Sequence, residues 1–291
     1  MERIRLNFKL FRTTYCRVLS VVTATVSIVL LFIDKERLGI NGLRCGCISV
    51  ICVLLVPIIV AFFWIMIYRS IKVKEQSPMI KIQYGDLWKY AFPKKTKGKR
   101  IVVINVNTTF DVIVDEDISK IQKPLVSPLT MHGQLIKKLK EKGIELDELS
   151  KAIKENLRLN KIEPIRTISR DVKARGEIEC YEKGTVAVYE YKDTFFYLLA
   201  FSEFDEDNKA QNSKEEMVKT ITKLVDYYDA HGQGYVMFVP LMGTGMSRTR
   251  ISAQESLKIL ASVFDIYSDK LHGDVSIVVY DKDRTKIALE R

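Results

Sequence analysis

Two long runs without a charged residue dominate the first quarter of the chain. Val18–Ile33 is 16 residues long and Ile48–Tyr68 is 21. A bilayer core of about 30 Å needs about 20 helical residues, so the second run is long enough to span it, and residues 15–17 can extend the first. The pattern predicts a transmembrane hairpin with spans at 15–33 and 48–68, which we favour over a pair of core helices in a soluble protein.

The flanks of these runs predict an orientation. Residues 1–17 hold five Lys or Arg and residues 69–81 hold four, whereas the turn at 34–44 holds three beside two acidic residues. Because the flank richer in Lys and Arg stays in the cytoplasm, both termini are expected there, with a short loop outside. No ionisable residue lies inside either run, so the sequence marks no ion pathway.

From residue 100 the pattern changes to buried strands that alternate with amphipathic helices. Short β-branched runs predict strands at 101–106, 185–191, 195–201, 235–240 and 275–280. Helices are expected at 134–142 and 147–159, and two more begin at the capping-box pairs Ser213–Glu216 and Ser252–Glu255. This alternation predicts a three-layer α/β/α domain with a mixed sheet.

The chain therefore divides into three predicted parts. These are an N-terminal tail and hairpin at 1–71, a basic juxtamembrane linker at 72–99, and an α/β domain at 100–291. The linker interleaves lysines with aromatic residues, so it either lies on anionic lipid headgroups or packs on the domain.

Charge and cysteine content exclude two classes of function. Residues 1–99 carry 17 Lys and Arg against 5 Asp and Glu, which leaves 29 against 31 for residues 100–291. The positive charge thus belongs to the membrane-proximal third, and a nucleic-acid groove on the main domain is not supported. The five cysteines show no CxxC spacing and are odd in number, so neither a metal site nor a disulfide framework is expected.

The loop after the predicted strand at 235–240 is suited to an anion. It reads LMGTGMSRTR, and its two glycines, Gly243 and Gly245, leave backbone N–H groups free to turn toward a phosphate ahead of a helix. Arg248 and Arg250 add forked donors. The loop is neither a P-loop nor a dinucleotide fingerprint, because it has no Gly-Lys-Ser/Thr and no third glycine.

Polar residues also follow the strand at 101–106. Asn105 and Asn107 can hydrogen-bond ribose hydroxyls, Phe110 can stack on a base, and Asp111 can accept a hydrogen bond from adenine or ribose. His132 and Gly133 stand where the next helix begins, which suits a phosphate or ribose. The alternatives stay open: Asn in a loop often forms an Asx-turn, and Phe is more often part of the core.

These two loops resemble those of a macro domain, the ADP-ribose-binding α/β/α module. The motifs VNTTFD, TMHGQ, GTVAVYEYKDTFFYLLAFSEFDEDN and VPLMGTGMSRT, spread over about residues 100–281, are similar to those of the membrane effectors of type II Thoeris anti-phage defence. The resemblance implies a ligand site built from Asn105, Asn107, Phe110, Asp111, His132, Gly133, Leu241, Gly243, Thr244, Gly245, Met246, Ser247 and Arg248.

The resemblance also implies a mechanism. A TIR-domain enzyme would release an ADP-ribose derivative such as a histidine conjugate, the macro domain would bind it, and the effectors would form homo-oligomers that disrupt the inner membrane through their two spans. No catalysis, metal, further cofactor or nucleic-acid partner is expected. The alternatives are a membrane-tethered ADP-ribosyl hydrolase and a tethered scaffold. Hydrolytic macro domains carry a glycine-rich run where this chain has SPLTMHGQ, which argues against hydrolysis.

Overall fold

The protein forms two compact units in the computed structural model. One comprises residues 1–71 with 282–291, and the other comprises residues 72–281. The structure describes residues 2–32, 42–95, 98–117, 121, 124–204, 210–211, 213–243 and 251–288. Each unit is treated on its own below.

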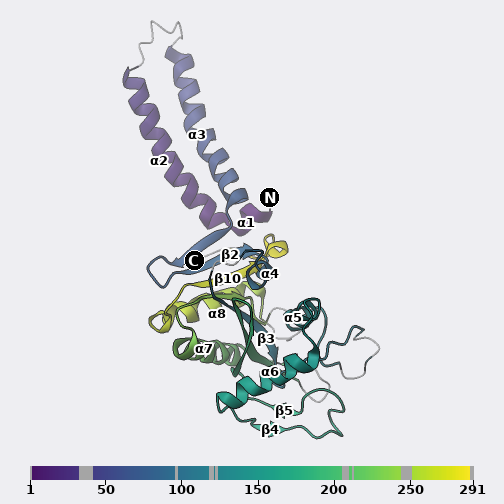
Figure 1. Cartoon of the computed structure of the whole chain (residues 1–291). Helices are drawn as coiled ribbons and strands as arrows, with labels where there is room; N and C mark the ends of the chain where they lie inside the picture. The colour runs from purple at the N-terminus through teal and green to yellow at the C-terminus, as the bar shows by residue number, and fades with distance from the viewer. Residues whose placement is uncertain are drawn as a thin grey trace. The chain divides into compact units, whose positions relative to one another are not determined.

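The first unit is built on two long helices that pack along each other, α2 (Phe8–Phe32) and α3 (Gly42–Ile67), after a short α1 (Glu2–Leu6) (Figure 1). On α3, Pro57, Ala61 and Ile65 are buried at four-residue intervals. Most of its other large apolar side chains are exposed, including Ile51 at 53% and Phe63 at 58%. Such a surface is unfavourable in water and suited to lipid.

Over the described residues, one helix is long and apolar enough to cross a membrane. It is Val50–Ile67 within α3, with a mean hydropathy of 3.1. The second predicted span is therefore retained as a candidate on its length and composition. The first predicted span lies in α2, which does not meet the same criterion over its described residues, and its last residue, Ile33, lies outside them. Two spans stay a prediction.

The second unit is a mixed β-sheet. Its strands run in the order β1 (Ser70–Lys74), β2 (Ile80–Gly85), β10 (Val275–Tyr280), β9 (Val236–Pro240), β3 (Arg100–Asn107), β7 (Thr194–Phe204) and β6 (Val186–Tyr191), with β8 (Ala210–Gln211) paired to β7. The pairs β2–β10, β10–β9, β9–β3 and β3–β7 are parallel, and β6–β7 is an antiparallel hairpin. A mixed sheet confirms the predicted fold class.

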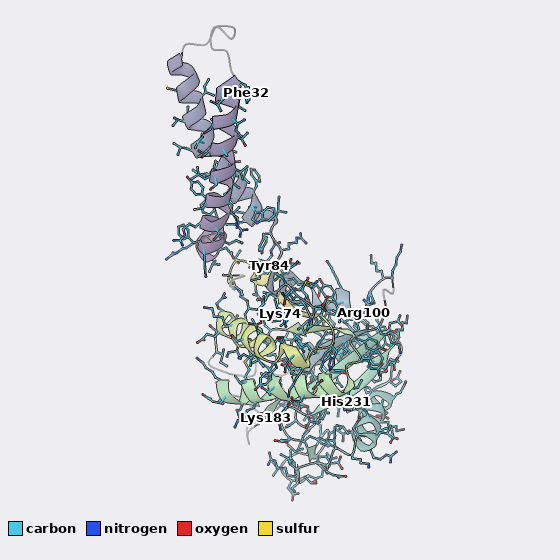
Figure 2. The ribbon with its side chains drawn as sticks, turned by 90° about the vertical axis from the view of Figure 1, so that its left-hand side faces the viewer. Phe32, Lys74, Tyr84, Arg100, Lys183 and His231 are labelled. Carbon is cyan, nitrogen blue, oxygen red and sulfur yellow. The ribbon has the colours of Figure 1, made fainter. Side chains whose placement is uncertain are left out.

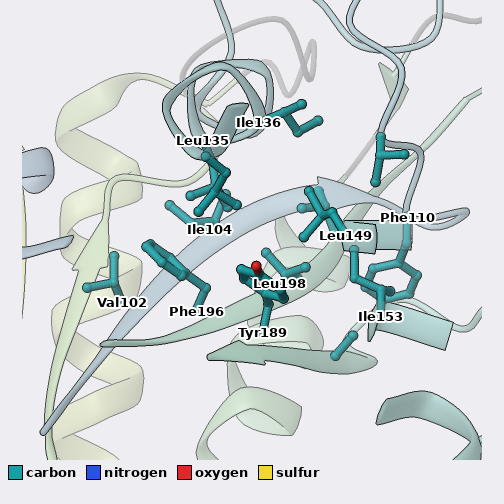
Figure 3. Packing of buried hydrophobic residues seen from close by; sticks show 14 of the residues in the cluster. Val102, Ile104, Phe110, Leu135, Ile136, Leu149, Ile153, Tyr189, Phe196 and Leu198 are labelled. Atoms are coloured by element: carbon teal, nitrogen blue, oxygen red, sulfur yellow. The ribbon is translucent and has the colours of Figure 1, made fainter. Parts of the chain in front are cut away.

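Helices cover both faces of this sheet, which gives the predicted three layers (Figure 1). One face packs on α4 (Leu87–Ala91), α5 (Met131–Lys140) and α6 (Leu146–Leu159) through the even positions of β3, Val102, Ile104 and Val106. Figure 3 shows Ile104 beside Leu135 of α5. The other face packs on α7 (Lys214–His231) and α8 (Ala253–Ile266). In Figure 2, Lys183 lies beside the first turn of α7, and His231 marks its last turn.

Both predicted capping boxes are present. The Ser213 hydroxyl accepts from the backbone N–H of Glu216, whose carboxylate accepts from the Ser213 N–H, and Ser252 and Glu255 repeat the pattern at α8. Each box satisfies two helix N–H groups that have no partner within the helix. The predicted apolar stripe of α7, which includes Met217, Ile221 and Tyr228, is fully buried.

We expect Ser213→Ala to lower the free energy of unfolding by about 1 kcal/mol, because the N–H of Glu216 loses its acceptor. Urea unfolding followed by Trp88 fluorescence in a Trp64→Phe background measures the change. Thr222→Ala on the same helix is the control, since the Thr222 hydroxyl only returns to the Val218 carbonyl and alanine favours a helix. Equal losses in the two variants would contradict a capping role.

The domain begins earlier than residue 100. Residues 72–99, predicted as a linker, supply most of β1, all of β2 and α4 to the second unit. In β2, Ile80, Ile82 and Tyr84 are buried, and the residues between them are partly exposed. This is the period of a half-buried strand. The predicted linker is therefore part of the domain, which was the second of the two alternatives for this segment. The lysines between the buried positions give it the composition of a linker.

Candidate functional site

The two predicted loops leave the sheet at the same edge. Strands β3 and β9 pair in parallel, with Arg100 opposite Val236 and Val102 opposite Phe238, so their carboxyl ends point the same way. Asn105 and Asn107 end β3, while Leu241 and Gly243 follow the last residue of β9. Ligands of open α/β sheets bind at this edge.

Asn105 has unused hydrogen-bonding capacity. Strand alternation places its side chain on the α7–α8 face of the sheet, with Ile101 and Val103. Its Oδ1 atom is buried and has no hydrogen-bond partner among the residues that the structure describes. A buried amide oxygen without a donor costs about 1–3 kcal/mol, so this atom is a ready acceptor for a ligand hydroxyl or amine.

Asn107 and Asp111 are instead bonded to protein groups. Asp111 is fully buried, and its Oδ2 accepts from Asn107 Nδ2 at 2.8 Å, Thr109 Oγ1 at 2.7 Å and Lys173 Nζ at 2.6 Å. Its Oδ1 accepts from the Glu177 N–H at 2.7 Å, and its own N–H donates to Asn107 Oδ1 at 3.0 Å. We predicted that Asp111 contacts adenine or ribose. In this structure its carboxylate instead bonds to protein groups and has a structural role.

Through these bonds Asp111 holds an excursion of the chain, residues 160–185 between α6 and β6, against the end of β3. This excursion contains the small hairpin of β4 (Arg166–Thr167) and β5 (Glu179–Cys180). Gly176 has a φ of +77°, and a Cβ there would overlap Asp111 Oδ1, so only glycine fits. The preceding residue, Arg175, donates two hydrogen bonds to the Asp115 carboxylate, of 2.9 and 3.0 Å.

Hydrogen bonds and a neighbouring positive charge keep the Asp115 carboxyl ionised. Burial raises the pKa of its carboxyl, but the hydrogen bonds from Arg175 and the Leu125 N–H, together with the Arg175 charge, bring the pKa below its ordinary value. Two ion pairs thus hold the excursion in place, and one of them, Lys173–Asp111, is buried.

Phe110 belongs to the core. It is 3% exposed, its ring meets Tyr181 edge-on at 5.6 Å, and Figure 3 shows it beside Leu149 and Ile153 of α6. Its φ of +51° turns the chain away from β3. In this structure Phe110 is therefore a core residue, which was the alternative to stacking on a base.

His132 and Gly133 form the first turn of α5, which Thr130 caps by accepting from the Gly133 N–H at 3.0 Å. Burial lowers the pKa of His132 to about 4, against a smaller rise from the Asp111 charge, so the imidazole is neutral at pH 7. A Cβ on Gly133 would overlap the Ser127 carbonyl oxygen. Close backbone approach thus explains this glycine without any ligand.

The turn after β9 needs a glycine at its start. Gly243 is buried with a φ of +71°, a conformation that other residues rarely adopt. The preceding carbonyl, of Met242, accepts from Ser256 Oγ at 2.6 Å, which ties the turn to the first turns of α8. The rest of the predicted phosphate loop lies outside the described residues: Thr244, Gly245, Met246, Ser247 and Arg248.

Sequence reasoning missed Lys173, Thr109, Gly176 and Glu177. The signal for Thr109 was its place inside VNTTFD, and Gly176 lies in the turn-rich run DVKARGE. Nothing local links Lys173 to Asp111, which is 62 positions away. Within the described ranges, no group of three or more His, Cys, Asp or Glu side chains could hold a metal ion.

Comparisons with known proteins bear on the whole chain. Residues 80–280 match the family model described as Thoeris protein ThsA, Macro domain. A Thoeris protein ThsA from Bacillus amyloliquefaciens (strain Y2) is 27% identical over 287 residues, which cover 96% of this chain and 87% of the relative.

Among solved structures, macrodomains of Oceanobacillus iheyensis align with the chain. In one, a mutant macrodomain, the alignment covers 75% of this chain and 93% of the mutant. In another, the macrodomain with ADP, it covers 74% and 90%. Both have 12% identity and a TM-score of 0.41. At that score and identity, the alignment gives no information about ligands.

Proposed function

The chain belongs to the Thoeris ThsA macro-domain family, and from this premise we propose that its macro domain binds an ADP-ribose-derived nucleotide at the carboxyl edge of β3 and β9. Asn105 carries the proposal, because its buried Oδ1 accepts from no described residue and stands at the edge where a ribose would lie. The left-handed turn at Gly243, held to α8 through Met242 and Ser256, supplies backbone at the end of the neighbouring strand β9. In the proposed site, Asn105 accepts from a ribose hydroxyl, and the residues from Leu241 to Arg248 enclose the diphosphate.

The remaining predicted contacts take indirect roles in this proposal. Asn107 and Asp111 support the edge of the sheet through their hydrogen bonds with each other and with Lys173. Phe110 supports it through its packing in the core. His132, neutral at pH 7 and close enough to respond to the Asp111 charge, borders the site without donating a proton. Asp111 has both oxygens engaged and is not a free general base. These observations favour binding over hydrolysis.

The proposed signal comes from a TIR-domain enzyme that consumes NAD on phage infection, and a histidine conjugate of ADP-ribose is the first ligand to test. Binding would drive the chains into a homo-oligomer and let the hairpin disrupt the inner membrane, with both termini in the cytoplasm. The exposed apolar surface of α3 and the candidate span Val50–Ile67 support a membrane effector. No nucleic acid, metal or further cofactor takes part in this scheme.

Thermal unfolding of the full chain tests the binding step. We expect ADP-ribose, or its histidine conjugate, to stabilise the folded state by about 2.7 kcal/mol at 100 times its Kd, because a ligand of the native state must do so. The absence of a shift with either nucleotide would contradict the proposal. Release of free ADP-ribose from an ADP-ribosylated protein in the same sample would instead identify a hydrolase.

Two variants localise the effect. Asn105→Leu is expected to abolish the ligand-induced shift without lowering the stability of the free protein, because it removes a buried acceptor that no described residue satisfies. Gly243→Val should abolish it through the turn, and Gly143→Val is its matched control, with a φ of +84° and no neighbouring atom within 4 Å of an added Cβ. A shift that survives both Asn105→Leu and Gly243→Val would place the ligand elsewhere.

A further inference from the structure

A groove of about 480 Å³ lies between α4 and the last turns of α5. Trp88 and Phe92 form its apolar floor, with their rings stacked at 6.2 Å. Four lysines surround them: Lys89, Lys94, Lys138 and Lys142. The ribose-binding role proposed above does not use any of these residues.

The groove runs along α4 and reaches the amino edge of the sheet at Phe92, whereas the proposed nucleotide site lies at the carboxyl edge of β3 and β9. Phe92 packs on Tyr191 and Phe196, and the Ala91 carbonyl accepts from Thr194 Oγ1. Thr194 pairs with Arg100, the first residue of β3, so these contacts mark the amino edge. The other end of the groove approaches the first turn of α5, where Trp88 Nε1 donates to Gln134 Oε1, but the two sites share no lining residue.

Aromatic rings contact two of the four lysines of the groove. Lys138 Nζ lies 5.3 Å from the centre of the Trp88 ring, and Lys142 Nζ lies 5.0 Å from that of Phe92. Over the described part of the chain, none of the four lysines forms an ion pair. Cation–π contact holds an ammonium group in place without neutralising it, so the groove presents fixed positive charge beside apolar rings.

The same pattern continues along this edge. Lys99 lies over the rings of Phe195 and Tyr235, at 5.4 and 5.9 Å, and Lys192 lies over Tyr191 at 5.4 Å. Five of the six cation–π pairs in the described residues thus lie along this edge. An anionic partner that also buries ring edges fits this chemistry.

We propose that the groove between α4 and α5 docks the phosphate headgroups of an anionic lipid bilayer. The lysines would meet the phosphates, and Trp88 and Phe92 would enter the interfacial layer, where aromatic rings are favoured. The groove begins at Asp86, and only residues 68–85 separate it from the end of α3, the candidate membrane helix. A bilayer that holds α3 is therefore tethered to the groove by the chain itself.

Charge favours lipid over nucleic acid as the occupant. Residues 72–281, the unit that contains the groove, carry 33 basic against 31 acidic side chains, so a long polyanion leaving the groove meets a domain that is almost neutral. The groove also contains two carboxylates, Asp86 and Glu141. Dispersed headgroups can avoid these carboxylates, whereas a continuous phosphate backbone cannot.

Trp88 can report docking by itself, because the chain has only two tryptophans. The full chain with Trp64→Phe is reconstituted in nanodiscs of zwitterionic lipid, with or without phosphatidylglycerol, and each carries a headgroup spin label that quenches nearby indoles. No nucleotide is added, so the result is independent of the nucleotide-binding proposal. We expect quenching of Trp88 in anionic discs and its loss in zwitterionic discs or at high salt.

Lys138→Gln with Lys142→Gln should lower the docking equilibrium constant about 25-fold, since each lysine near an anionic surface contributes about fivefold. The matched control is Lys151→Gln with Lys258→Gln, two exposed lysines elsewhere on the domain, which should quench like the parent. Unchanged urea unfolding confirms that both variants fold.

Three outcomes would overturn the proposal. They are equal quenching in both kinds of disc, no quenching in either, and a response of Trp88 in zwitterionic discs to single-stranded oligothymidylate, which would identify a nucleic-acid groove instead.

Discussion

Replacing Lys173 with methionine is expected to lower the free energy of unfolding by about 3–5 kcal/mol, the largest loss for any single change discussed for this chain. Asp111 is fully buried, and Lys173 is its only cationic partner within ion-pair distance among the described residues. Methionine fills most of the volume but leaves the carboxylate charge without compensation in a medium where solvation by water is lost. Urea unfolding monitored by Trp88 in the Trp64→Phe background measures the change.

Two comparisons separate the buried charge from other causes. Lys154→Met removes the pair with Glu177, whose partners are 52% and 22% exposed, and it should cost less than about 1 kcal/mol. Asp111→Asn combined with Lys173→Met removes both charges and should be milder than Lys173→Met alone, which a double-mutant cycle shows directly. A single-variant loss as small as that of Lys154→Met would contradict the anchoring role.

Acidification is expected to destabilise the domain through His132 by about 3 kcal/mol between pH 6.5 and pH 4. Burial, opposed in part by the Asp111 charge, lowers the pKa of His132 from 6.5 to about 4 in the folded state. Between these values, the unfolded chain binds a proton that the folded chain does not. The stability is therefore complete above pH 6.5 and is lost as the pH falls.

His132→Gln isolates this contribution. The loss of stability from pH 7 to pH 5 should be about 2 kcal/mol greater in the parent than in the variant. His231→Gln, on the exposed end of α7, serves as the control and should follow the parent. Parallel pH profiles for the parent and His132→Gln would show that His132 titrates alike in both states.

The sequence predicted those parts of the fold that are encoded within a few residues. The capping boxes at Ser213 and Ser252 fix helix starts by local hydrogen bonds, and both helices begin directly after them. The run at 101–106 is apolar on both faces, as expected for a central strand that lies between two layers of helices. The predicted hairpin turn at Lys192–Asp193 is likewise local, with Lys192 at a φ of +55°.

What the sequence did not predict depends on distant pairing. The period of β2 is visible at Ile80, Ile82 and Tyr84, but its partner β10 follows almost 200 residues later. The role of Asp111 depends in the same way on Lys173. For the candidate site, chain position alone predicted that both loops leave the same edge of the sheet, and the parallel pairing of β3 and β9 agrees with that placement of the strand ends. It could not indicate that Asn107 and Asp111 bond to protein groups while Asn105 retains an unused acceptor.

The sheet order has a practical consequence for work with the isolated domain. Strand β10 lies between β9 and β2, so a fragment that starts at residue 100 would lack the chain that covers one side of β10. Its backbone N–H and C=O groups along residues 275–280 would then be open to pairing with a second molecule, the usual origin of insoluble material. A fragment must therefore keep β2, residues 80–85, so the short sequence after the candidate membrane helix is needed to cover this edge of β10 in an isolated domain.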